Sequence, residues 1–478
     1  MVKVIYKPLF FCLFFYLLIF DIFSSDKGEW NKYLEEDSLK IQIEPIQYFT
    51  LKNGIKVYYI ENHMLPQINL SFSIDGGFIE EQSEKKGLTQ LWGKNIVYSG
   101  SPEFPRDKLA EYLEMRASSI VFSANMERVQ FNLDSLSSNF EEDLNVFFNI
   151  IFNPGFNEED LNLNKKIALE EIKKRRERSD SMAYLAAQLY EWQGDVRSQI
   201  MTSGSITAIG LEDMARWQRH MLNPSRFSLL ISGDFSKEKV KLLLNNYLGA
   251  KNAELKDYND SLLKSQQPSK EAVILFQKKE IPQTTIIFRA DGIPHSSPDY
   301  YAFKIIDHIL GGDSFNSYLT REIRTKRGWA YSSYSFYSAD RYTGNISLFV
   351  QTAKENSVDV IEIIEDILDH PERFLNETAL RDAQSVIKNR FVFSFETPEK
   401  LASLQLALIQ DGLDENYLST FVDNIEKCNL DNIYRVYKKY YQKENFFISI
   451  TGSSDSLQTL SKRKSVIHQQ VVDFKVPE

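Results

Sequence analysis

The feature that most constrains the fold is a pattern that occurs twice. Residues 211–233 read LEDMARWQRHMLNPSRFSLLISG, and residues 430–452 read LDNIYRVYKKYYQKENFFISITG. Each stretch combines a short amphipathic helix, a polar turn and an apolar run that ends in glycine. Arg216 corresponds to Arg435, and the final glycines correspond to each other, both at an offset of 219 residues. This constant register predicts a duplicated domain.

The beginnings of the two halves also correspond loosely. A predicted strand at 67–75 and another at 284–290 each lead into a glycine-containing turn and then a helix. Residues 251–271 are polar and lack periodicity, which is typical of a linker. We therefore expect an N-terminal lobe at 45–250 and a C-terminal lobe at 272–460.

Strands alternate with long amphipathic helices in each half. In the first half the pattern predicts helices at 107–116, 140–152, 158–178 and 237–248, and strands at 119–124 and 129–133. A chain of 478 residues is too long for one ordinary core. We expect an α+β fold of two homologous lobes, each a mostly antiparallel sheet with helices packed on one face, the two enclosing a chamber.

The composition is that of a soluble globular protein. It is 43% hydrophobic and 26% charged, and its net charge is −10 with both signs interspersed. The absence of a long basic block argues against nucleic acid as the main partner. Cys12 lies in the apolar N-terminal run and Cys428 is the only other cysteine, so a mature chain has no intrachain disulfide and no cysteine-based metal site.

The N-terminus differs in kind from the rest of the chain. Two lysines precede an unbroken apolar run at 9–20, which is too short to span about 30 Å of hydrocarbon as a helix. A basic start, a short apolar core and small residues at Ser24 and Ser25 are typical of an export signal. We expect a signal at 1–25 and a periplasmic location. Phe23 makes a poor cleavage site, so an uncleaved membrane anchor facing the periplasm is the alternative.

Three segments resemble a known family. Residues 49–81, FTLKNGIKVYYIENHMLPQINLSFSIDGGFIEE, and 85–101, KKGLTQLWGKNIVYSGS, resemble the opening of the pitrilysin, insulinase and mitochondrial-processing-peptidase family of zinc metallopeptidases. Residues 310–335, LGGDSFNSYLTREIRTKRGWAYSSYS, are similar to that family's C-terminal signature. With the duplication, the resemblance covers roughly 49–452.

The zinc motif of that family is missing. Active members carry H-x-x-E-H on the helix after the glycine pair, where two histidines bind zinc and the glutamate activates water. The matching positions hold Gln90, Gly93 and Lys94, and the remaining ligand position falls on Glu171, with Glu170 as the fallback. Gln90 is a weak neutral donor, protonated Lys94 has no lone pair, and Gly93 supplies no base. The resemblance therefore implies no zinc in this chain.

Nothing else in the sequence replaces this site. We expect Glu171 either to pair with Lys94 in place of the metal or to be a solvated helix residue. No two histidines stand at i and i+3 or i+4; the six are His63, His220, His295, His308, His370 and His468. The chain also lacks a G-x-S-x-G elbow, a Walker loop and a dinucleotide fingerprint.

The C-terminal signature is better preserved. It places Arg324 and Tyr331 seven residues apart, and the resemblance implies that this pair binds substrate near its scissile carbonyl. A guanidinium and a phenol can bind developing negative charge without a metal of their own. The simpler interpretation is a solvated arginine at a helix end and a packed tyrosine. Gly311-Gly312 read as an ordinary helix stop, and Tyr318 stands where the family often has arginine.

Two hypotheses follow from the resemblance. In the first, the chain is the non-zinc subunit of a heterodimeric metalloendopeptidase, inactive alone. A homologous zinc-bearing partner hydrolyses peptides or unfolded polypeptides, and this chain supplies Arg324 and Tyr331. In the second, it is a non-catalytic peptide-binding or structural assembly subunit with the same fold.

Overall fold

The computed structural model describes residues 43–250, 273–312, 316–460 and 470–477. The expected signal at 1–25, the expected linker at 251–271 and His468 lie outside the described residues. Contacts group the chain from Pro45 onward into one compact unit. No helix within the described ranges is both long enough and apolar enough to cross a bilayer.

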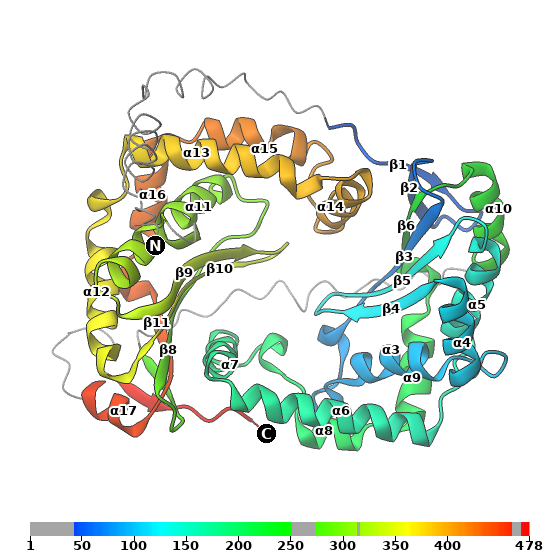
Figure 1. Ribbon diagram of the computed structural model, residues 1–478, viewed down its shortest axis with the longest axis horizontal. Helices are drawn as coiled ribbons and strands as arrows, with labels where there is room; N and C mark the ends of the chain where they lie inside the picture. The colour runs from blue at the N-terminus through cyan, green and yellow to red at the C-terminus, as the bar shows by residue number, and fades with distance from the viewer. Residues whose placement is uncertain (1–42, 251–272, 313–315, 461–469, 478) are drawn as a thin grey trace, which may run out of the picture. The chain divides into compact units, whose positions relative to one another are not determined.

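Two six-stranded sheets form the framework, one from each half of the chain (Figure 1). The first has the order β1-β2-β6-β3-β5-β4; its strands are β1 (Gln47–Thr50), β2 (Lys56–Glu61), β3 (Gln67–Asp75), β4 (Ser119–Ala124), β5 (Arg128–Leu136) and β6 (Phe227–Gly233). The second has the order β12-β7-β11-β8-β10-β9; its strands are β7 (Ile274–Lys278), β8 (Gln283–Asp291), β9 (Ala330–Ala339), β10 (Gly344–Ala353), β11 (Phe447–Gly452) and β12 (Val471–Asp473). Most neighbours are antiparallel, and the pairs β2–β6, β7–β11 and β7–β12 are parallel.

Helices cover these sheets in both halves. Those of the first half are α3 (Leu88–Ser99), α4 (Arg106–Arg116), α5 (Phe140–Phe152), α6 (Glu158–Glu177), α7 (Ser179–Glu191), α8 (Ser203–Ala208), α9 (Leu211–Met221) and α10 (Lys237–Tyr247). Those of the second half are α11 (Tyr300–Asp307), α12 (Ser357–Asp369), α13 (Glu377–Val392), α14 (Pro398–Gln410), α15 (Tyr417–Glu426), α16 (Leu430–Tyr440) and α17 (Ser454–Leu460). The four helices predicted in the first half are present, each within one residue of its expected bounds.

The predicted duplication is confirmed by the order of the strands. From β2 to β4, the first sheet matches the second sheet from β7 to β9, position by position. The offset of 219 residues relates α9 to α16, and it also relates α7 to α14 at both ends. The outermost strands β1 and β12 do not correspond. Strand β1 precedes β2 in the sequence, whereas β12 follows β11 and lies beyond residue 460, where we expected the second lobe to end. The two-lobed α+β fold is thus confirmed.

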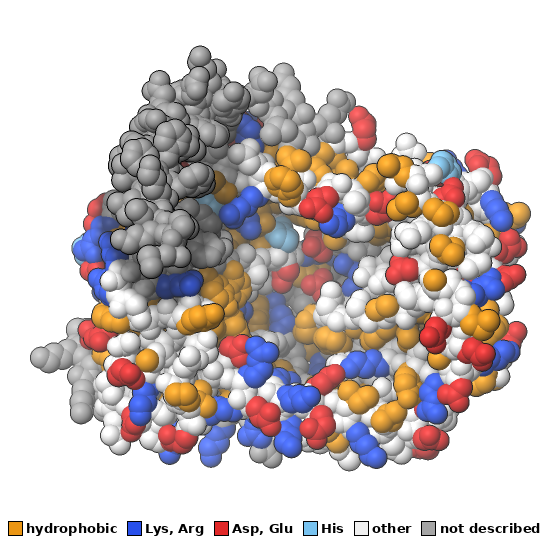
Figure 2. Space-filling model, in the orientation of Figure 1, with side chains coloured by type: hydrophobic (Ala, Val, Ile, Leu, Met, Phe, Trp, Pro, Cys, Tyr) orange, Lys and Arg blue, Asp and Glu red, His pale blue; other side chains and the backbone are white. Residues whose placement is uncertain are grey.

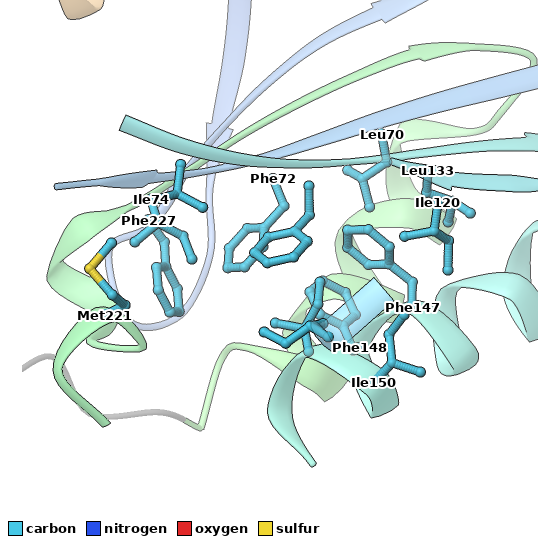
Figure 3. Packing of buried hydrophobic residues seen from close by; sticks show 14 of the residues in the cluster. Leu70, Phe72, Ile74, Ile120, Leu133, Phe147, Phe148, Ile150, Met221 and Phe227 are labelled. Carbon is cyan, nitrogen blue, oxygen red and sulfur yellow. The ribbon is translucent and has the colours of Figure 1, made fainter. Parts of the chain in front are cut away.

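The core of the first lobe lies between its sheet and its helices (Figure 3). Alternate residues of β3 are buried, as a strand with one covered face requires. Phe72 of β3 meets Phe147 and Phe148 of α5 edge to face, at ring-centroid distances of 6.5 and 5.9 Å. Each such buried ring stabilises the fold by about 1.5–3 kcal/mol. The same core buries Trp92 of α3 and Ile172 of α6, the two helices that carry the first candidate site.

One helix of each half lies on the sheet of the other half. Helix α7 packs on β7, β8 and β11, and Ser449 Oγ of β11 donates to the carbonyl of Ala183, 2.7 Å away. Helix α14 packs on β2 and β6, where Gln410 Nε2 donates to Ser228 Oγ at 2.9 Å. Strand β12 and the residue after it add further apolar contacts to α7 through Val472 and Phe474. The two halves are therefore interlocked.

The β4–β5 turn of the first half carries a carboxyl in an acidic environment. Burial and the second-half carboxylates Asp340 and Asp411 together raise the pKa of Glu127 from 4.5 to about 7, with burial the larger cause. Arg128 and Arg341 oppose this effect without cancelling it. The ionised form of Glu127 therefore weakens the contact between the halves.

We predict that Glu127→Gln stabilises the protein at high pH. A carboxyl with a raised folded-state pKa binds its proton more tightly when folded, so stability falls as pH rises from about 4.5 to 7. At pH 8 the substitution should raise the free energy of unfolding by about 1 kcal/mol, since water screens part of the repulsion. The gain should shrink as the pH is lowered toward 4.5 in urea unfolding experiments. The exposed control Glu111→Gln should show no such pH dependence, and an equal response of both variants would contradict the prediction.

Candidate functional site

Helix α3 carries the positions of the family's zinc motif, and buried contacts fix its place. The Glu81 carboxylate accepts hydrogen bonds from the backbone N–H groups of Gly87 and Thr89, at 3.0 and 2.6 Å. Burial raises the pKa of Glu81 in spite of these bonds. The indole of Trp92 is fully buried and donates to Gln218 of α9 at 2.5 Å. The start and the middle of α3 are thereby held against the lobe.

The three polar side chains at the expected zinc ligand positions contact one another. Lys94 Nζ lies 3.1 Å from one carboxylate oxygen of Glu171 on α6, and Gln90 Nε2 donates to the other at 3.3 Å. The expected ion pair between Lys94 and Glu171 is therefore present. Their side chains are 34% and 46% exposed, so the pair contributes at most about 1 kcal/mol.

This set of side chains does not fit a zinc ion. An ammonium and an amide N–H occupy the carboxylate oxygens that a metal would need, and neither can donate a lone pair. Across the described ranges, no three His, Cys, Asp or Glu side chains gather in a way that could hold a metal ion.

The position of the general base is filled by an aromatic ring that the sequence did not reveal. A Cβ atom placed on Gly93 would lie 1.9 Å from Cε2 of Phe122. This phenylalanine belongs to β4, and its ring lies 5.3 Å from that of Phe131 and 6.5 Å from that of Trp92. A side chain at residue 93 would therefore require the ring of Phe122 to shift.

The second candidate site lies in the other half, on the π-helical segment η7 (Thr320–Thr325) and the start of β9. Buried Glu322 binds three of the four cations in REIRTKR: Lys326 at 2.5 Å, Arg327 at 3.1 Å and Arg321 at 4.0 Å. Burial raises the pKa of Glu322, but the hydrogen bonds from Lys326 and Arg327 outweigh it and hold the pKa below its usual value.

Arg324 is the cation that Glu322 does not bind. No acidic side chain in the described part of the chain forms an ion pair with it. Its guanidinium carbon lies 5.9 Å from the ring centre of Tyr331, whose side chain is 77% exposed. The structure therefore brings the two predicted residues together, and Tyr331 is not packed in the interior.

A β-bulge accounts for the exposure of Tyr331. Ser332 pairs with Gln351 and Ala330 pairs with Thr352, so Tyr331 is the extra residue on β9. Bulges redirect side chains and are frequent beside functional sites. Simple alternation along the strand could not have predicted this orientation.

Strand β9 is fixed from behind by the helix that precedes η7. A Cβ on Gly311 would lie 2.1 Å from the backbone nitrogen of Ser335, so the π-helical turn η6 (His308–Gly312) packs directly on the strand. Ser335 Oγ donates to the buried Asp307 carboxylate at 2.6 Å. Gly311 is thus more than the expected helix stop. Tyr318 is buried against Phe374, with a ring-centroid distance of 4.8 Å.

We predict that Gly93→Glu destabilises the protein by about 1–3 kcal/mol, because the new side chain overpacks the space of Phe122. Urea unfolding should show a lower midpoint with an unchanged slope. Truncation of the ring in the double variant Gly93→Glu with Phe122→Ala should cost less than the sum of the two single changes. Additive effects would show that Phe122 does not occupy this space.

We also predict that Gln90→His with Lys94→His creates a zinc site. Two histidines at i and i+4 would then face Glu171 in the arrangement that zinc binds. Isothermal titration calorimetry should show one zinc per chain, and adding Glu171→Gln should weaken it at least tenfold. Equal zinc binding with and without Glu171 would contradict the assignment of this residue.

Two family models match the chain. Residues 56–198 match the insulinase family (peptidase family M16), and residues 208–387 match the peptidase M16 inactive domain. Among curated proteins, the chain is 22% identical over 403 residues to a non-peptidase homolog, YmxG, of Helicobacter pylori, covering 84% of this chain and 92% of the relative. It is 20% identical over 397 residues to an uncharacterized zinc protease, YmxG, of Bacillus subtilis, covering 82% and 94%.

Solved structures show the same fold. A peptidase M16 inactive domain from Pseudomonas fluorescens superposes with a TM-score of 0.75 at 20% identity, covering 86% of this chain and 98% of the other. The periplasmic protease PqqL of Escherichia coli gives a TM-score of 0.71 at 16% identity, covering 88% of this chain and 47% of PqqL. The two models and the two-lobed fold together show that this chain belongs to the insulinase family, peptidase family M16, as a member without the zinc-binding motif.

Proposed function

We propose that this chain is the non-zinc subunit of a two-chain peptidase and supplies Arg324 and Tyr331 to the active site of a homologous partner. The observation that carries the proposal is the contrast between the two candidate sites. At the zinc positions, Lys94 pairs with Glu171 and an aromatic ring fills the place of the base. At the other site, an exposed tyrosine stands beside an arginine that Glu322 leaves available.

The chemistry of this pair suits an acyl-transfer reaction. A zinc ion on the partner would polarise the scissile carbonyl and activate the attacking water. The guanidinium of Arg324 keeps its charge at every working pH and presents a rigid fork of donors. The Tyr331 hydroxyl adds a further donor, so the pair can bind the oxygen on which negative charge develops.

The comparisons support a member that does not hydrolyse peptides by itself. The Helicobacter relative is described as a non-peptidase homolog, which also favours the alternative of a non-catalytic peptide-binding or assembly subunit. The two functions can be distinguished by one measurement. Only the peptidase-subunit function requires the Arg324–Tyr331 pair to change the rate at which a partner hydrolyses peptides. A zinc-bearing homologue from the same organism is the partner to use in the test.

We also propose that the protein acts outside the cytoplasm, on peptides or unfolded polypeptide. The apolar run at residues 9–20 after two lysines supports export. N-terminal sequencing of the protein recovered from the periplasm would separate a cleaved signal from a retained anchor.

We predict that the mixture of this chain and its zinc-bearing partner cleaves an internally quenched peptide at least tenfold faster than either chain alone. Arg324→Ala and Tyr331→Ala should each lower kcat by about 10²–10³, because each removes a donor to the developing oxyanion. Tyr331→Phe should act like Tyr331→Ala if the hydroxyl is the active group.

The matched control is Lys326→Ala, which removes a nearby cation that is bound to Glu322. It should leave kcat in the mixture within about twofold of wild type. Size-exclusion chromatography should show that all four variants still associate with the partner. If the mixture is no faster than the partner alone, the peptidase-subunit proposal is wrong and the non-catalytic function is favoured.

A further inference from the structure

An aromatic strip lies on the second sheet next to the Arg324–Tyr331 pair. We define it by four residues: Tyr331, Tyr334 and Phe336 of β9, and Tyr184 of α7. Ring contacts connect Tyr184, Tyr334 and Phe336, with centroid distances of 6.0 Å from Tyr184 to Phe336 and 6.3 Å from Tyr334 to Phe336. Figure 2 shows apolar side chains gathered on this face at the position of β9 and β10.

The strip is held rigid from below and from the side. Phe349 of β10 is 5% exposed, and the rings of Tyr334 and Tyr184 stack on it at 4.7 and 5.9 Å, with interplanar angles of 21° and 6°. The hydroxyls of Tyr184 and Tyr334 lie 3.4 Å apart. Since the rings are already ordered, a ligand that stacks on them loses little further entropy in binding.

The outer side of the strip is open. Tyr331 is 77% exposed and Tyr334 is 36% exposed, both unusual for aromatic residues on a sheet. The outer edge of β9 is covered by η6 and η7, through Gly311 against the backbone of Ser335 and the hydrogen bond from Thr320 Oγ1 to the carbonyl of Ser333, so a ligand reaches the rings from the face of the strand. An extended peptide lying across that face would place its side chains against the rings.

The duplicated framework does not require these rings. The residue of α14 equivalent to Tyr184 at the offset of 219 is Ser403. In the second sheet, three neighbouring strands pair at Ser449, Ile287 and Phe349, and the last of these is the ring on which the strip stacks. The equivalent row of the first sheet, beneath α14, consists of Leu230, Ser71 and Asn132. A cavity of about 300 Å³ is lined there by Ser71 and Ser403, among others. The same fold therefore stands without an aromatic platform.

We propose that the aromatic strip binds an aromatic side chain of an extended peptide whose backbone passes the Arg324–Tyr331 pair. The occupant is peptide, because the strip continues into a pair of hydrogen-bond donors suited to peptide carbonyls. It is aromatic, because stacked and edge-to-face ring contacts reward an aromatic side chain beyond its apolar area. This inference identifies a substrate class for the proposed function. It rests on that function, because it assumes that the substrate lies beside Arg324.

The test uses the full chain alone, so it does not depend on a catalytic partner. The probes are fluorescein-labelled ten-residue Gly/Ser peptides that carry one central Phe, Leu or Ala. In fluorescence anisotropy titrations, the Phe peptide should bind about tenfold more tightly than the Ala peptide. Tyr334→Ser should abolish this difference, and Tyr334→Leu should abolish the preference for Phe over Leu while retaining a preference for Leu over Ala.

The matched control is Tyr48→Ser, which removes a 50% exposed tyrosine from β1 in the first sheet. It should keep the full preference for Phe, and thermal melting should show that every variant is folded. Equal affinity of wild type for Phe and Ala peptides, or no measurable binding of the Phe peptide, would overturn the proposal. So would a Tyr334→Ser variant that changes only the oligomeric state in sedimentation, since the strip would then bind a second copy. If the Phe peptide binds more tightly but the mixed peptidase assay shows no added activity, the proposed function is wrong and the peptide-binding role of the strip is supported.

Discussion

The packing of α7 on the opposite sheet is the contact on which the rest of the structure depends. At the end of α7, the side chain of Glu191 is fully buried and lies 2.6 Å from the guanidinium of Arg289 on β8. Removing one partner of such a pair costs about 3–5 kcal/mol, because the other charge stays buried without compensation. Helix α6 leads directly into α7, so one stretch of chain carries Glu171 of the first candidate site and Tyr184 of the aromatic strip. The continuous backbone of α6 and α7 thus joins the first candidate site to the aromatic strip on the second sheet.

Much of the fold follows from local patterns in the sequence. The constant offset predicts the duplicated sheets, and periodicity places four helices of the first half, α4, α5, α6 and α10, within one residue. What local patterns do not contain is the partner of each apolar face. The sequence patterns do not predict α7, and no local pattern shows that the strands that cover it are β7, β8 and β11. The addition of β12 to the second sheet escaped prediction for the same reason.

In the candidate sites, too, some contacts could be predicted from the sequence and others could not. The pairing of Lys94 with Glu171 could be anticipated as one of two alternatives, because the family resemblance places both residues at zinc-ligand positions. Helix periodicity by itself puts only Gln90 and Lys94 on one face. The ring of Phe122 could not, since it reaches Gly93 from a strand that is distant in sequence. A glycine inside a helix costs about 1 kcal/mol relative to alanine, and that unexplained cost was the available signal. The exposure of Tyr331 depends on a bulge, which alternation alone does not reveal.

The late position of β12 also orders the events of synthesis. Helix α7 leaves the ribosome before any strand of the sheet on which it packs has been made, and Val472 and Phe474 follow all its other neighbours. The face formed by Ala183 and Ala187, fully buried in the finished protein, therefore stays uncovered while the second half is translated. The docking of α7 is in this sense a late step of folding, which waits for the strands of the second half.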